Sequence, residues 1–161
     1  MSTGASLALD AHLAAPNALG VAQRRMRQRA IGAMLCEAQM SEVATFEFLG
    51  GNVAVFTTRS PQKETPNEDV AALWPVGLTS GVLAVADGLG GHAGGERASR
   101  LATEALHKSL QDAIPEKEST AEAVELRAAI LNGLEAANES VRDLGTGAAT
   151  TMALVEIQDR T

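Results

Sequence analysis

Ten residues that follow an apolar run have the composition of a site for a hard metal ion or a phosphate. Residues 82–86 are apolar, and the segment 87–96 behind them begins with an aspartate and contains five glycines. Mg²⁺ and Mn²⁺ prefer oxygen ligands. Asp87 offers a carboxylate, and Gly88 offers a carbonyl that no side chain obstructs. The alternative is that Asp87 and Gly88 simply form a tight turn between two strands.

A second acidic group precedes another short apolar stretch. Glu68 and Asp69 lead into the run 70–74. If the strands that carry these residues are antiparallel neighbours, we expect the carboxylates of Glu68, Asp69 and Asp87 to converge. Two divalent ions bridged by one carboxylate can hold and activate a water molecule for attack on a phosphorus atom. The two acidic groups together therefore favour a metal site.

The same glycines also fit the fingerprint of a dinucleotide-binding loop. The segment from Gly88 to Ala93 follows a strand pattern and precedes a helix pattern, as that fingerprint requires. However, a dinucleotide site needs a helix that returns to a parallel strand with an acidic residue about 20 positions further on. Here a second helical pattern follows instead, and Asp87 would place negative charge beside the pyrophosphate. We therefore favour the metal site.

The hydrophobic pattern predicts an α+β chain in which short strands are followed by two helices and a last strand. Ser119 and Glu122 have the spacing of a capping box, which marks the start of the second helix. The last stretch is apolar on both alternations, which predicts a central strand covered on each side. The expected elements are strands 45–49 and 53–58 around a turn at 50–52, strands 70–74 and 81–86, a helix at 95–111, a helix from 119 to about 145 and a strand at 149–157.

Composition and charge argue against several classes of function. The chain has 161 residues and a net charge of −7, which disfavours a nucleic-acid partner because such binding depends on clustered Lys and Arg. One cysteine, Cys36, excludes an internal disulfide framework and is interpreted as a small hydrophobe. No stretch approaches the roughly 20 apolar residues that span a bilayer. Since no secretory signal is recognisable either, we expect a cytoplasmic protein with no membrane span.

The first 40 residues differ from the rest and are interpreted as an extension. They are rich in alanine and carry four arginines within residues 24–29. We expect residues 1–40 to be disordered or helical, either as a solvated helix or as a basic amphipathic helix that contacts an acidic partner or a membrane surface. The remainder, residues 41–161, has the length of one domain.

Three motifs carry a resemblance to a known family. They are Asn67-Glu68-Asp69, the segment 84–92 and the segment 94–99, and in order and interval they resemble those of the metal-dependent protein phosphatases of type 2C, the PPM family. Residues 147–154 resemble the family's strand with a Gly-Thr-Thr sequence. The resemblance implies an antiparallel β-sandwich flanked by helical pairs. It also implies hydrolysis of phosphoserine and phosphothreonine in proteins by water bound at a binuclear Mn²⁺ or Mg²⁺ centre.

The resemblance also implies roles for individual residues. Asp87 would bridge the two ions, and Gly88 would bind one of them through its carbonyl oxygen. Glu68 and Asp69 would hold one ion directly or through water. His92 lies in the loop typical of bacterial members, where it would either donate a proton to the leaving group or stabilise the loop.

Two departures from the family affect the expected activity. The family commonly has a phosphate-binding arginine three residues before the motif asparagine, but this position is Glu64, so Lys63 or Arg59 would have to bind the substrate phosphate. The resemblance covers about residues 45–157, roughly the first half of the catalytic domain, and the family's later metal-binding aspartates are absent. We therefore expect an incomplete sandwich, weak metal binding and little turnover.

The sequence thus predicts a truncated protein serine/threonine phosphatase. Its expected partners are phosphoserine and phosphothreonine proteins, together with a regulator or a cognate kinase. The alternative is a catalytically degenerate phosphatase-like module that binds a phosphoprotein or regulator without hydrolysing it. A stable monomeric fold would favour the module, whereas association through the strand at 149–157 would favour the fragment.

Overall fold

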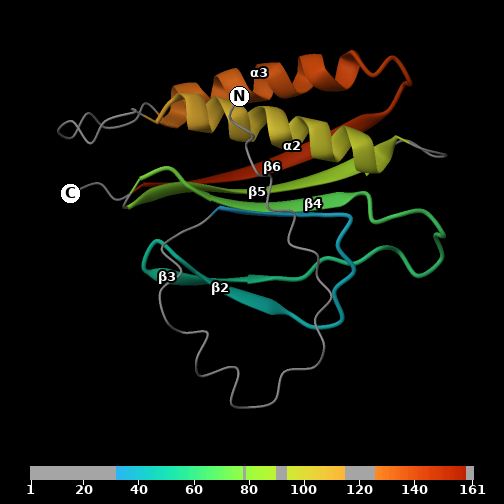
Figure 1. Cartoon of the computed structure of the whole chain (residues 1–161), viewed down its shortest axis with the longest axis horizontal. Helices are drawn as coiled ribbons and strands as arrows, with labels where there is room; N and C mark the ends of the chain where they lie inside the picture. Colours follow the sequence, from blue (N-terminus) through green and yellow to red (C-terminus); the bar gives the residue numbers. More distant parts are fainter. Residues whose placement is uncertain (1–31, 78, 90–93, 115–125, 159–161) are drawn as a thin grey trace, which may run out of the picture.

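A computed structural model describes residues 32–77, 79–89, 94–114 and 126–158. These residues form a four-stranded antiparallel sheet, a two-stranded antiparallel sheet and two helices, which is an α+β arrangement. The helices cover one side of the larger sheet, and the smaller sheet lies on its other side (Figure 1). The larger sheet has the order β1 (Ala33–Cys36), β4 (Asp69–Pro75), β5 (Ser80–Leu89), β6 (Ala149–Gln158); the smaller has β2 (Ala44–Phe48) and β3 (Gly51–Val55); the helices are α2 (Gly95–Asp112) and α3 (Leu126–Arg142).

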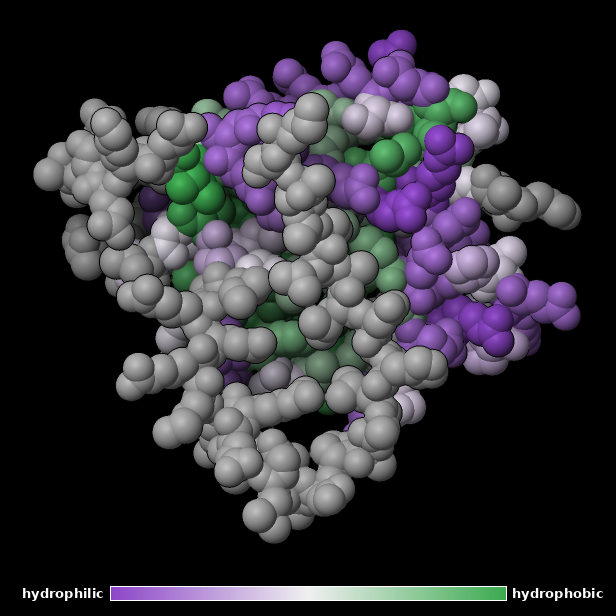
Figure 2. All heavy atoms as spheres, viewed as in Figure 1, coloured by the Kyte–Doolittle hydropathy of each residue, from purple (hydrophilic) through white to green (hydrophobic). Residues whose placement is uncertain are grey.

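The core lies between the larger sheet and the two helices. Alternate residues of β4 and β5 point toward the helices because side chains along a strand alternate between its faces. On α2 the buried residues recur at intervals of three or four positions, which places them on one side of the helix. The core contains Ala72, Trp74, Val82 and Ala84 from the sheet and Leu106, Leu110, Leu126 and Ile130 from the helices. Figure 2 shows hydrophilic residues over the outer surface of the helices, at the top of the view.

Gly133 allows the two helices to approach closely. A Cβ atom at this position would lie 2.5 Å from Leu106 Cδ1 and 3.1 Å from Leu106 Cα. Such distances are shorter than van der Waals contact, so any side chain at residue 133 would push α3 away from α2. The glycine therefore fixes the spacing of the layer that covers the sheet.

The hairpin, the strands β4 and β5 and the first helix are confirmed, but the hairpin turn predicted at 50–52 is wrong, because it begins one residue earlier and has two residues instead of three. Phe48 pairs with Gly51, so the turn consists of Leu49 and Gly50. Both have positive φ angles, 49° and 77°, as the two-residue hairpin turns that match strand twist require. The predicted second helix is described from Leu126 onward, and the capping box at Ser119 and Glu122 lies outside the described residues.

The prediction of a central, doubly covered final strand is wrong. β6 pairs with β5 on one side only and is an edge strand of the described sheet. Met152 and Leu154 pack against the helix-covered core, whereas Val155 on the other face is 55% exposed. Both alternations are apolar, but among the described residues the helix side of β6 is only partly buried and the other side is exposed. The local pattern could not reveal this because it is the same for both faces.

The sequence did not predict β1. Residues 33–36 were expected to belong to a disordered or helical extension, but they pair with β4 from Val70 to Leu73 and form an edge of the larger sheet. The weak strand propensity of Ala and Met there is outweighed by main-chain hydrogen bonding to β4. The domain boundary after residue 40 stays a prediction, and residues 1–31 lie outside the described part. Neither described helix is long and apolar enough to cross a membrane.

Candidate active site

Two carboxylates stand side by side on neighbouring strands. Asp69 at the start of β4 is directly opposite Asp87 in β5. The residues next to them, Val70 and Ala86, are buried under the helices, so both aspartates face the other side of the sheet. Burial, and next the negative charge of Asp87, raise the pKa of Asp69. Two like charges held together in this way favour the binding of a cation.

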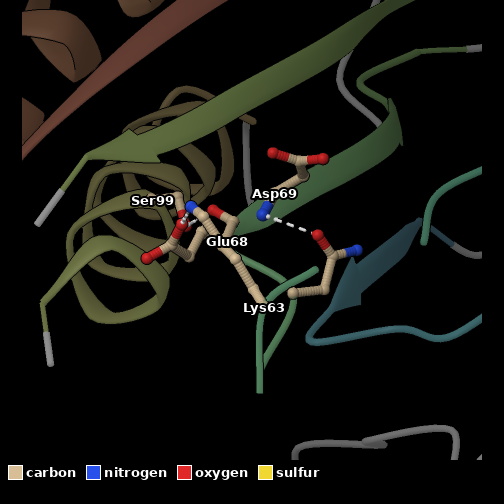
Figure 3. Close-up of polar contacts among 5 residues, drawn as sticks. Lys63, Glu68, Asp69 and Ser99 are labelled. Carbon is tan, nitrogen blue, oxygen red and sulfur yellow. Dashed lines mark hydrogen bonds and ion pairs between the residues drawn. The ribbon is translucent and has the colours of Figure 1, made fainter. Parts of the chain in front are cut away.

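Glu68 does not join this pair. Its carboxylate forms an ion pair with the ammonium of Lys63 and lies beside Gly95 at the start of α2, where a Cβ atom would be 2.9 Å from Oε1. Figure 3 shows the carboxylate of Asp69 pointing away from Glu68 and Lys63. The expected convergence of all three carboxylates is therefore confirmed for Asp69 and Asp87 only. Glu68 lies directly before the first residue of β4, and its carboxylate turns toward Lys63 and the start of α2, which separates it from Asp69.

Gly88 lies in the strand and not in a loop behind it. β5 continues to Leu89, so the prediction that the strand ends at Ala86 is wrong. A Cβ atom at residue 88 would lie 1.9 Å from the carbonyl oxygen of Gly95 and 2.9 Å from that of Glu68. Only glycine lets the end of β5 pass this closely to the start of α2. Its role as a carbonyl ligand stays a prediction.

Hydrogen bonds fix the main chain around the acidic residues. The hydroxyl of Ser99 in α2 donates to the carbonyl of Glu68 at 2.6 Å, and the amide of Gly88 donates to the same oxygen at 3.1 Å. The hydroxyl of Thr150 in β6 donates to the carbonyl of Asp87 at 2.9 Å. The acidic residues are therefore anchored from α2, β5 and β6. Ser99 and Thr150 lie within the motifs 94–99 and 147–154, but their residue types alone did not predict these contacts.

Asn67 is a further residue whose role only the structure reveals. It is buried, and its side-chain amide donates to the hydroxyl of Thr57 at 2.7 Å and to the carbonyl of Ala38 at 2.9 Å. Its side-chain oxygen accepts a hydrogen bond from the amide of Asp69 at 3.2 Å. The first motif residue thus ties the start of β4 to two distant segments. In the sequence, the feature that could have indicated this role is a polar residue directly before two acidic ones.

The two predicted phosphate ligands differ in their contacts. The hydrogen bond and the charge of Glu68 raise the pKa of Lys63, and the charges of Asp87 and Asp69 add to this effect. Lys63 therefore lies within the field of all three carboxylates. Arg59 is exposed, and its guanidinium lies 3.5 Å from the carbonyl oxygen of Glu64 in its own loop. Phosphate binding by either residue stays a prediction.

The donor set at this edge fits a hard divalent ion only in part. Asp69 and Asp87 supply the carboxylate oxygens that Mg²⁺ and Mn²⁺ prefer. Within the described ranges, no cluster of three or more Asp, Glu, His or Cys side chains could hold a metal ion. His92, which we predict as a loop residue or proton donor, lies outside the described residues.

Comparison with known proteins identifies the family. A family model described as protein phosphatase 2C matches residues 58–161, which is well over half of the chain. The matched segment contains the acidic residues, both helices and the larger sheet except β1. No curated protein and no solved structure matches the chain. The chain therefore belongs to the protein phosphatase 2C family, as the motifs predict.

Proposed function

We propose that this chain is a protein serine/threonine phosphatase that acts with Mn²⁺ or Mg²⁺ at the Asp69–Asp87 pair. The observation that carries the proposal is the placement of these two carboxylates directly opposite each other within the segment that matches the phosphatase family. The proposal includes the family's finer architecture, an antiparallel sandwich flanked by helical pairs. Its partners would be phosphoserine and phosphothreonine proteins, a regulator or a cognate kinase.

In this proposal the residues of the site either bind the ions or hold the main chain in place. Asp69 and Asp87 would bind the ions, with Gly88 and Glu68 as further ligands in a two-ion site. Bound ions would supply activation of water and stabilisation of the phosphate's negative charge. Asn67 and Thr150 hold the main chain of the two aspartates in place.

The chain's own cations would attract the substrate. The side chain of Lys63 is 56% exposed, so its ammonium is accessible to a phosphate dianion from solvent. A lysine binds phosphate as a point charge, which gives attraction with little control of orientation. We therefore expect the phosphate group to be bound more weakly than by a bidentate arginine.

The test is release of phosphate from phosphoserine and phosphothreonine peptides, with and without Mn²⁺. We expect slow, Mn²⁺-dependent release, which Asp87→Asn lowers by at least about tenfold because one ligand carboxylate is lost. Asp143→Asn changes an exposed aspartate after α3 and serves as the matched control with unchanged activity. A phosphotyrosine peptide should react more slowly.

Two outcomes would contradict the proposal. Equal activity of Asp87→Asn and wild type would remove the aspartate pair from catalysis. Saturable binding of the phosphopeptide without any release of phosphate would instead identify a degenerate binding module.

A further inference from the structure

One basic side chain already occupies the acidic edge of the sheet. The ammonium of Lys63 forms an ion pair and a hydrogen bond with Glu68 Oε2 (Figure 3). Lys63 precedes Glu68 by five residues, and its own amide donates to the carbonyl of Ser60 in a tight turn at 3.1 Å. The loop before β4 thus folds back and brings its lysine onto the glutamate.

The two partners of this ion pair differ in their freedom to move. The side chain of Glu68 is 9% exposed, whereas that of Lys63 is 56% exposed. Two hydrogen bonds to the carbonyl of Glu68, from Gly88 and Ser99, also fix its main chain. The ammonium is therefore the partner that can move to solvent, where a long exposed side chain gains rotamer freedom. The carboxylate must stay.

A divalent ion at the aspartate pair would act on the lysine directly. Asp69 adjoins Glu68 in the chain, and Asp87 is opposite Asp69 on β5. An ion bound there carries two positive charges and repels a nearby ammonium. Since binding free energies are reciprocal, the presence of the ammonium must weaken ion binding to the same extent.

We propose that Lys63 is an internal counter-ion of the acidic site, which a divalent cation displaces and so frees to bind the substrate phosphate. This inference rests on the proposed function, since it assumes an ion at Asp69 and Asp87. It adds an order of events: the ion binds first and the phosphate second. Lys63 thereby changes its partner from Glu68 to the substrate phosphate when the ion binds.

The test is a calorimetric titration of the full chain with Mn²⁺ alone. Lys63→Gln removes the competing charge, and we expect it to bind Mn²⁺ about threefold to tenfold more tightly than wild type. Lys63→Met keeps the aliphatic stem and provides a second neutral variant, while Lys63→Arg keeps the charge and should bind like wild type. Lys108→Gln is the matched control, because Lys108 is also paired with a carboxylate, that of Asp112, but on α2. Circular dichroism checks that each variant is folded.

The outcomes separate this inference from the proposed function. Equal or weaker Mn²⁺ binding by both neutral variants overturns the role of Lys63 and leaves the phosphatase proposal intact. Tighter binding without phosphopeptide hydrolysis supports the role of Lys63 and counts against the phosphatase proposal. No Mn²⁺ binding by any variant overturns both.

Discussion

The two faces of the four-stranded sheet differ in what covers them and in how deeply their apolar residues are buried. On the face toward the helices, Trp74, Val82 and Ala84 are at most 4% exposed and pack against α2 and α3. On the opposite face, Val85 and Val155 are 54% and 55% exposed. A cavity of about 390 Å³ lies there between the two sheets, lined by residues of β3, β4, β5 and β6.

The helix-covered face therefore stabilises the fold, whereas the opposite face carries the candidate site. Close packing against the helices supplies most of the buried apolar surface and hence most of the stabilisation. The aspartate pair is on the face with the cavity, where burial is incomplete and a ligand could enter. Like charges there reduce stability, and a cation that binds the site would restore it.

Gly88→Ala tests the contact that joins the end of β5 to the start of α2, and it should have the largest effect. The new methyl carbon would lie 1.9 Å from the carbonyl oxygen of Gly95, and main-chain atoms cannot rotate away. We expect a loss of about 3 kcal/mol or more in the free energy of unfolding, measured with urea. Gly51→Ala is the control, since its methyl group would meet nothing closer than 3.6 Å. Similar stabilities for the two variants would contradict the close approach.

Leu106→Ala and Val85→Ala compare the two faces directly. Leu106 is fully buried in the helix-covered core, so its truncation should cost about 3 kcal/mol of unfolding free energy. Val85 is half-exposed on the other face, and its truncation should cost less than about 0.7 kcal/mol. Urea unfolding measures both. Equal losses would mean that the second face is as well packed in solution as the first.

Asp69→Asn should have the smallest effect and the opposite sign. At pH 7 it removes the repulsion from Asp87, so we expect about 0.5 kcal/mol of stabilisation. The pKa of Asp69 is raised on folding, so the folded chain binds this proton more tightly than the unfolded chain. The stability that this group contributes is therefore present at low pH and lost as the pH rises through its folded pKa.

The stabilising effect of Asp69→Asn relative to wild type should therefore shrink as the pH falls toward the ordinary aspartate pKa of 3.8. Urea unfolding at pH 7 and at pH 4.5 measures the trend. A destabilising effect at pH 7 would show that Asp69 is stabilised by contacts other than those in the structure.

Local sequence patterns predicted where α2 and β6 begin and end, but not which elements lie next to each other in space. The helix at 95–111 and the strand at 149–157 agree with α2 and β6 to within one residue at each end, because hydrophobic period and glycine or proline boundaries are local properties. The edge position of β6 and the pairing of β1 depend on which segments meet in space. No property of residues 33–36 alone indicates that β4 lies beside them.

The candidate site was predictable where it depends on strand pairing. Antiparallel neighbours place Asp69 opposite Asp87, and the sequence interpretation anticipated that convergence. The separation of Glu68 from Asp69 depends on where β4 begins, because Glu68 lies just outside the strand and its carboxylate turns toward Lys63. The contact of Lys63 with Glu68 depends on the path of an irregular loop, for which residue types give no period. These contacts required the structure.

The most direct test of the aspartate pair as a cation site is the effect of Mn²⁺ on unfolding. With Mn²⁺ at ten times its dissociation constant, the free energy of unfolding of the wild-type chain should rise by about 1.4 kcal/mol, because the ion binds only the folded state. Asp87→Asn should lose most of this increase, and Asp143→Asn should keep it. An equal increase in wild type and Asp87→Asn, or no increase in any of them, would contradict the assignment.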